Sequence, residues 1–400
     1  MVLRNFCQYF LTPRYDGGVL YSRVGFMLLV FLVITAVLAM AGALVLPIFT
    51  DLHRAVHIHL VFALGVMPMI MAAMTHFVPV LTRTGGAARQ VELLAGLVWQ
   101  AGVLATAFFA FSLPASVRLL AALLALLAVA RMAGWQWMRA RAALGSPHPG
   151  VYWYLAALLC LAASLLAVVA MDVWPEQLLA FKRLHLHLNL FGFVGLTAIG
   201  TLQVLLPTAA GRPDPGVAGR LRADLPFALG GTLLIGFGAA WLPLLSWPGL
   251  ILWLLPLARL GRSWQQNFHA GIFSWHGATP LLAMAGVSYC LALLAGGLHA
   301  AGWVESASAG HLLVFAFLFS LVSGAIGQLL PLWLRPGRQT EWHALARRWL
   351  TYGGGARALL LLAAGLLVLA GVRWGAVLAL AGLLPLVLTA LWTVLQSRRA

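Results

Sequence analysis

The amino-acid sequence predicts an all-α polytopic membrane protein with twelve transmembrane helices arranged as three four-helix repeats. The first observation is the composition, because 62% of the 400 residues are hydrophobic and only 8% are charged. A soluble chain of this length cannot bury so much apolar surface. Second, apolar runs of about 20 residues, enough to cross a hydrocarbon core of roughly 30 Å, recur from Val24 onward. Third, one histidine–proline pattern occurs three times.

The apolar runs fill the chain and leave no room for a sizeable soluble domain. We therefore expect one transmembrane domain over 1–400, with repeats at approximately 24–137, 151–261 and 275–395. Residues 1–23 mix aromatic and basic side chains, which is typical of a cytoplasmic or interfacial segment. The expected spans are 24–47, 57–80, 91–112, 115–137, 151–171, 184–207, 224–243, 246–261, 275–297, 309–332, 355–371 and 374–395.

The positive charges indicate the orientation of these spans. Five of the 25 Lys and Arg residues fall in one set of alternate loops, namely Arg54, Arg118, Lys182, Arg183 and Arg373, and the others fall on the opposite side. Cytoplasmic loops of membrane proteins carry such an excess. We therefore expect a multi-pass membrane protein with both termini in the cytoplasm, and the net charge of +16 indicates topology rather than a nucleic-acid partner.

The repeated pattern places a histidine near the start of every fourth span. Each of its three histidines, His59, His187 and His311, precedes a proline by 20 residues, and they are separated by 128 and 124 residues, or four spans each time. Twenty helical residues cover about 30 Å, so each histidine and its proline lie at opposite membrane faces. The copies are HIHLVFALGVMPMIMAAMTHFVP (57–79), HLHLNLFGFVGLTAIGTLQVLLP (185–207) and AGHLLVFAFLFSLVSGAIGQLLP (309–331).

Two of the copies carry a second histidine, His57 or His185, two residues earlier. Residues i and i+2 differ by about 200° around a helix axis, so both cannot point to one centre. We take His59, His187 and His311 as the inward set, because the third copy keeps only this position. His57 and His185 then face a neighbouring helix, a second centre or the headgroup region.

The ligand types that the spans lack limit which metal or cofactor the protein could bind. The expected spans hold almost no carboxylates and no CxxC or HExxH motif, which argues against calcium and di-iron centres. Neutral imidazoles in an apolar bundle suit haem iron or copper. Arg54, Lys182 and Arg183 lie about one turn outside the histidines, where they could bind haem propionates or lipid headgroups.

Other polar residues suggest weaker hypotheses. His76 and His276 lie near the cytoplasmic ends of their spans and could belong to a second polar site or proton path, and Gln203 and Gln328 occupy nearly the level of His76. The remaining histidines fall in loops or at span edges, where we expect them to be solvated: His53, His148, His269, His299 and His343.

Histidines near the outer ends of helices 2, 6 and 10 of twelve resemble the catalytic subunit of haem–copper oxidases and nitric oxide reductases. The resemblance implies that His59 and His311 clamp a low-spin haem and that His185 or His187 is a copper ligand. The chain departs from that pattern because span 7 (DLPFALGGTLLIGFGAAWLP) lacks histidine and the earlier position on helix 10 is Ala309. A conventional oxygen-reducing, proton-pumping site is therefore not expected.

The stretch HIHLVFALGVMPMIMAAMTHFVPVLTRTGG more closely resembles the NnrS family of bacterial haem- and copper-containing membrane proteins, although Leu60 replaces the usual acidic residue. The resemblance implies a membrane protein that binds b-type haem, with copper as a second candidate cofactor. Such a protein would handle electrons or a diatomic gas such as nitric oxide. Whether it is an oxidoreductase stays open. A metal or small-solute transporter and a cofactor-free assembly subunit are the alternatives. Transporters usually have a polar midplane, whereas these histidines lie near one face.

Overall fold

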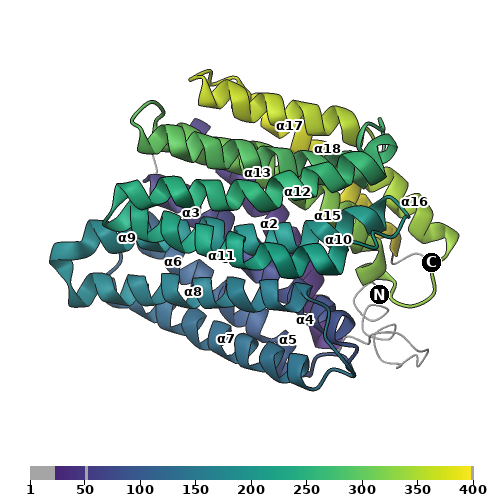
Figure 1. The fold of residues 1–400 in the computed structure, drawn as a ribbon, viewed down its shortest axis with the longest axis horizontal. Coiled ribbons are helices and arrows are strands. Elements are labelled where there is room, and N and C mark those ends of the chain that lie inside the picture. Colours follow the sequence, from purple (N-terminus) through teal and green to yellow (C-terminus); the bar gives the residue numbers. More distant parts are fainter. Residues whose placement is uncertain (1–22, 50–52, 398–400) are drawn as a thin grey trace.

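The protein is a bundle of long helices that lie side by side along one axis (Figure 1). The computed structural model describes residues 23–49 and 53–397, and every regular element in those ranges is helical. The elements are α2 (Arg23–Phe49), α3 (Arg54–His59), η1 (Leu60–Val66), α4 (Met67–Thr82), α5 (Arg89–Glu92), α6 (Leu94–Ala110), α7 (Ala115–Arg141), α8 (Gly150–Val173), η2 (Pro175–Gln177), α9 (Leu178–His187), η3 (Leu188–Leu196), α10 (Thr197–Ala209), α11 (Val217–Ala240), η4 (Pro243–Leu245), α12 (Ser246–Ile272), α13 (Ala278–Ala300), α14 (Ser306–Leu312), η5 (Leu313–Leu318), α15 (Phe319–Leu334), α16 (Glu341–Leu350), α17 (Gly354–Leu369) and α18 (Gly375–Ser397).

Twelve stretches of the described residues are long and apolar enough to cross a membrane, as the sequence predicts. Short connections join them, so successive spans return across the bundle. The expected interfacial segment, residues 1–23, lies outside the described residues except for Arg23, where α2 begins. The multi-pass architecture is therefore confirmed, and the division into three repeats stays a prediction.

Two helices near the C-terminal half differ from their predicted extents. Helix α12 continues to Ile272, well beyond the expected end at 261, because Trp264 and Phe268 on the extra turns are buried against the bundle. Helix α16 precedes the eleventh apolar run as a separate element, and His343 belongs to its capping box with Thr340. The expectation that His343 is solvated is wrong, since it is 2% exposed and its Nε2 lies 2.8 Å from the Arg335 carbonyl.

The three histidine-bearing spans share a composite build that the sequence did not predict. A short α-helix carries the histidine, a π-helical segment follows, and a second α-helix completes the span: α3–η1–α4, α9–η3–α10 and α14–η5–α15. A π-helical turn is rare and occurs frequently at functional sites. The same interruption directly after the histidine level in all three spans indicates a shared local requirement there.

The prolines lie in the last turns of these spans, as expected. Pro79, Pro207 and Pro331 are near the C-terminal ends of α4, α10 and α15. Each proline gives up one hydrogen bond to the carbonyl of residue i−4. The Pro79 carbonyl accepts from Thr84 N at 3.0 Å, and the Pro207 carbonyl accepts from Arg212 N at 3.1 Å. Each proline therefore takes part in the turn that ends its helix.

The sixth and tenth spans lie at the centre of the bundle. In their most apolar windows 83% and 78% of the residues are buried, more than in any other span of the described chain. Gly200 on α10 allows this close packing, since a Cβ atom there would lie 2.8 Å from Cβ of Trp153. The polar side chains on these spans therefore belong to the protein interior and its rim rather than to a lipid-facing surface.

Candidate functional site

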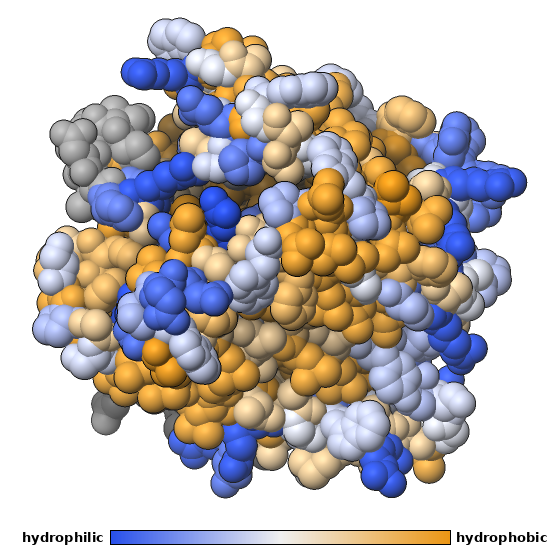
Figure 2. Space-filling view, turned by 60° about the vertical axis from the view of Figure 1, so that its left-hand side comes forward, coloured by the Kyte–Doolittle hydropathy of each residue, from blue (hydrophilic) through white to orange (hydrophobic). Residues whose placement is uncertain are grey.

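The histidines of the second, sixth and tenth spans lie at one end of the molecule, since these spans run in the same direction and each begins with its histidines. This is the end at which α3 and α9 are labelled in Figure 1. Figure 2 turns that end forward and shows hydrophilic side chains between broad apolar areas. His57, His59, His185 and His187 are half-buried, and His311 is exposed.

The backbone fixes the tautomer of two of these rings. Nδ1 of His59 donates to the Ala55 carbonyl at 2.8 Å, and Nδ1 of His187 donates to the Arg183 carbonyl at 2.8 Å. A carbonyl can only accept, so the proton is on the nitrogen that it contacts. In His59 and His187 the Nε2 lone pair is left for a ligand, the arrangement usual for metal-binding histidines.

His185 is held by a polar cluster that explains the neighbouring asparagine. Its Nδ1 lies 2.9 Å from Ser164 Oγ and 3.0 Å from the Ser164 carbonyl, and Asn189 Nδ2 donates to Ser164 Oγ at 2.9 Å. Ser164 on α8 thus connects two polar residues of the sixth span. Because the carbonyl again accepts from Nδ1, Nε2 of His185 is also left for a ligand.

Histidines of different spans are neighbours at this end of the bundle. His59 lies within electrostatic range of His185, and His311 lies within electrostatic range of His57. Residues i and i+2 point in nearly opposite directions from a helix, so His57 and His59 can have different neighbours. The second and tenth spans are the predicted clamp helices, and His57 is a histidine of the second span within electrostatic range of His311. The clamp of His59 and His311 stays a prediction.

A third pair includes a residue that sequence reasoning assigned to solvent. His187 interacts electrostatically with His299, which is exposed at the end of α13. Nδ1 of His299 donates to the Val304 carbonyl at 2.9 Å, so its Nε2 is also left for a ligand. Its place near the outer end of the ninth span was the one sequence signal that could have found it.

The described residues contain no group of three or more His, Cys, Asp and Glu side chains that could hold a metal ion. His59, His187 and His311 therefore do not converge as one three-histidine centre. The histidines that neighbour one another come from separate helices.

Cations and aromatic rings surround these pairs. Arg54 interacts electrostatically with His311, and Arg183 with His187, while Lys182 is exposed beside Arg183. Aromatic rings pack against the imidazoles, at centroid distances of 4.6 Å for His59–Phe109, 6.0 Å for His187–Phe191 and 5.4 Å for His311–Phe315. Phe191 and Phe315 each follow their histidine by four residues, a sequence signal that could have been recognised.

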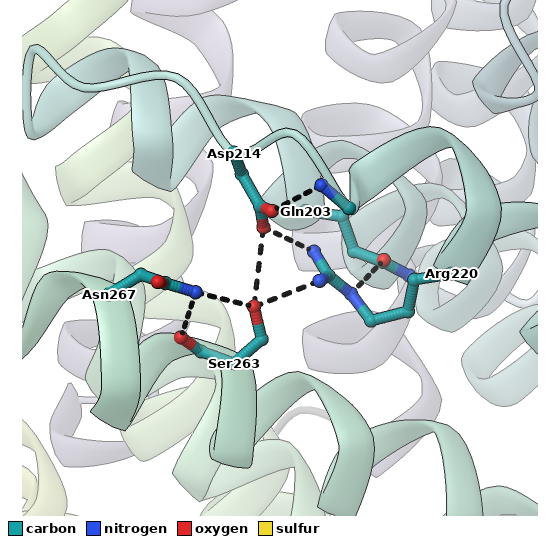
Figure 3. A network of polar contacts seen from close by, with 6 residues as sticks. Gln203, Asp214, Arg220, Ser263 and Asn267 are labelled. Atoms are coloured by element: carbon teal, nitrogen blue, oxygen red, sulfur yellow. Dashed lines mark hydrogen bonds and ion pairs between the residues drawn. The ribbon is translucent and has the colours of Figure 1, made fainter.

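The opposite end of the bundle holds a second polar set, centred on Arg220 (Figure 3). Arg220 Nε donates to Gln203 Oε1 at 2.8 Å, Nη1 to Ser263 Oγ at 2.9 Å, and Nη2 to Asp214 Oδ2 at 2.8 Å. Gln203 was expected at a polar level with His76 and Gln328. The ring centroid of His76 on α4 lies 6.5 Å from that of Trp333 on α15, the helix that also carries Gln328. His276 is exposed, and its Nδ1 accepts from Gly353 N at 3.0 Å.

No protein-family model matches the chain, and no curated protein matches it. The likeness to haem–copper oxidases and to the NnrS family therefore depends on the residues quoted above.

Proposed function

We propose that the protein is a haem-binding protein of the bacterial inner membrane that handles electrons or a diatomic gas such as nitric oxide. The observation that carries the proposal is that histidines of three different spans lie at one end of the bundle, and that Nδ1 of His59, His185 and His187 is hydrogen-bonded to a carbonyl. Two histidines from separate helices are the usual axial ligands of a low-spin haem. The strongly asymmetric distribution of Lys and Arg supports cytoplasmic termini.

The donor set fits haem better than an isolated copper ion. A bis-histidine haem needs two opposed imidazoles, whereas copper sites use three or four converging ligands. His57 and His311 would hold one haem, with Arg54 close enough to pair with a propionate. His59 and His185 would hold a second haem. Bound haem supplies an iron that exchanges one electron or, with a free coordination position, binds a small gas.

The protein residues contribute orientation and exclusion of water. The Ala55 and Ser164 carbonyls hold His59 and His185 by their Nδ1 atoms, which fixes the direction of each Nε2. Hydrogen bonding at the outer nitrogen also raises the basicity of a ligating imidazole. Phe109 covers one face of His59 and limits access of water to it.

The first experiment is a reduced-minus-oxidised absorption spectrum of the purified, haem-supplied protein, with iron and copper measured in the same sample. A Soret band with sharp reduced α and β bands and stoichiometric iron is the expected result. A folded preparation that is colourless and metal-free would overturn the haem proposal. The transporter and assembly-subunit alternatives would then take precedence.

A further inference from the structure

A pocket lies under the turn that joins α10 to α11, at the end of the bundle opposite the histidines. It has a volume of about 370 Å³ and lies between the last turns of α10 and residues 211–217. Gly211 adopts a positive φ of 67°, and the Arg212 N–H donates back to the Pro207 carbonyl. This tight turn places Arg212 in the pocket wall.

The lining has two chemical halves. Val204, Pro207 and Val217 supply an apolar side, and Gln203, Thr208, Arg212 and Asp214 supply a polar side. Asp214 is paired with Arg220, so its charge is already compensated, and the exposed Arg212 leaves the lining with a net positive charge. An anionic ligand with an apolar portion is complementary to such a lining.

Gln203 provides the second observation that points to a ligand. Its side chain is 0% exposed, and its Oε1 accepts from Arg220 Nε, which can only donate. This bond fixes which amide atom is the oxygen, and Nε2 of the same amide has no hydrogen-bond partner among the protein atoms. A buried donor without an acceptor costs about 1–3 kcal/mol. A ligand oxygen in the pocket would remove that cost.

We infer that this pocket binds the phosphate of an anionic phospholipid, with Arg212 and Gln203 Nε2 as its donors and an acyl chain along Val204 and Val217. Basic pockets at the ends of transmembrane helices commonly bind acidic headgroups. The site is independent of the proposed haem site, because it lies at the other end of the bundle.

Native mass spectrometry of the delipidated full-length protein tests the inference with phosphatidylglycerol as the probe. Arg212→Gln removes one cation near a membrane surface, which predicts about fivefold weaker binding. Gln203→Glu keeps an acceptor for Arg220 but removes the free donor and adds a negative charge, so we expect a larger loss. Arg141→Gln, at an exposed arginine near the end of α7, is the matched control and should bind as the unmodified protein does.

Three comparisons decide the result. Equal binding by Arg212→Gln and Arg141→Gln, with thermal unfolding unchanged in both, would overturn the site. Phosphatidylcholine binding as tightly as phosphatidylglycerol would overturn the requirement for an anion. Inorganic phosphate could bind with the same dependence on Arg212 while phosphatidylglycerol does not compete with it. That result would support a phosphate site but contradict a lipid headgroup as its ligand.

Discussion

The two ends of this bundle treat buried polar groups in opposite ways. At one end, His59 and His187 each use Nδ1 for a backbone carbonyl and leave Nε2 without a bond of this kind. At the other end, all three guanidinium nitrogens of Arg220 are hydrogen-bonded to protein atoms. A guanidinium whose nitrogens are all hydrogen-bonded fixes the geometry of the helices that it joins. Imidazole rings that are held by Nδ1 and have no such bond at Nε2 are positioned to bind a ligand. This contrast favours the histidine end as the functional site.

The largest expected effect is loss of haem on removal of a ligand histidine. On the proposed pairing, His57→Ala and His311→Ala should abolish the same spectral component, because each would remove one ligand of the same haem. His59→Ala and His185→Ala should instead abolish the other component. Haem content and the reduced-minus-oxidised spectrum of each variant provide the measurement.

His269→Ala is the control for these variants, because His269 is exposed near the C-terminal end of α12 and should leave both components intact. The pairing is wrong if His59→Ala and His311→Ala remove the same component while His57→Ala removes neither. That pattern would restore the clamp between His59 and His311 that the oxidase resemblance implies.

Substitutions in the Arg220 network should change the free energy of unfolding and not the absorption spectrum. The side chains of Arg220 and Asp214 are only 10% and 3% exposed, so Asp214→Asn leaves a buried cation without its charge partner. Breaking such a pair costs about 3–5 kcal/mol. Asp172→Asn breaks the more exposed pair with Arg118 and should cost less than about 1 kcal/mol. Unfolding in detergent compares the two variants, and equal destabilisation would contradict the contrast between the networks.

Ser164→Ala should have an intermediate effect. It removes the hydroxyl shared by His185 and Asn189 but keeps the Ser164 carbonyl that fixes the His185 tautomer. Loss of a buried hydrogen-bonding partner costs about 1–3 kcal/mol. The variant should therefore unfold more easily while retaining haem at His185. Complete loss of the second haem component in a folded variant would show that the hydroxyl, rather than the carbonyl, orients the ring.

Sequence patterns predicted the number of spans and the common end of the histidines because both follow from local hydropathy and the 20-residue spacing to proline. They did not predict which rings pair, since the direction of a histidine depends on the π-helical segments and on neighbouring helices. His299 comes from another span and depends on the Val304 carbonyl in a loop. The Arg220 network likewise needs Asp214 from a turn and Ser263 from α12, three elements that only the fold brings together.

The smallest expected effect concerns His148, whose ring accepts a backbone hydrogen bond. It lies at the same end of the bundle as the Arg220 network. Its Nδ1 accepts from Gly150 N at 3.2 Å, at the start of α8, which requires the neutral ring. Burial, and then the nearby Arg222, lower the pKa of His148 below its ordinary value of 6.5. Because the pKa of His148 in the folded protein is below that in the unfolded chain, the stability contributed by the neutral ring is fully present above pH 6.5. It is lost as the pH falls through the folded pKa. His148→Asn keeps an acceptor that does not titrate, so the difference in unfolding temperature between pH 7.5 and 5 should become smaller than in the unmodified protein. An unchanged difference would show that other groups carry the pH dependence and that His148 is no more than a spacer in its loop.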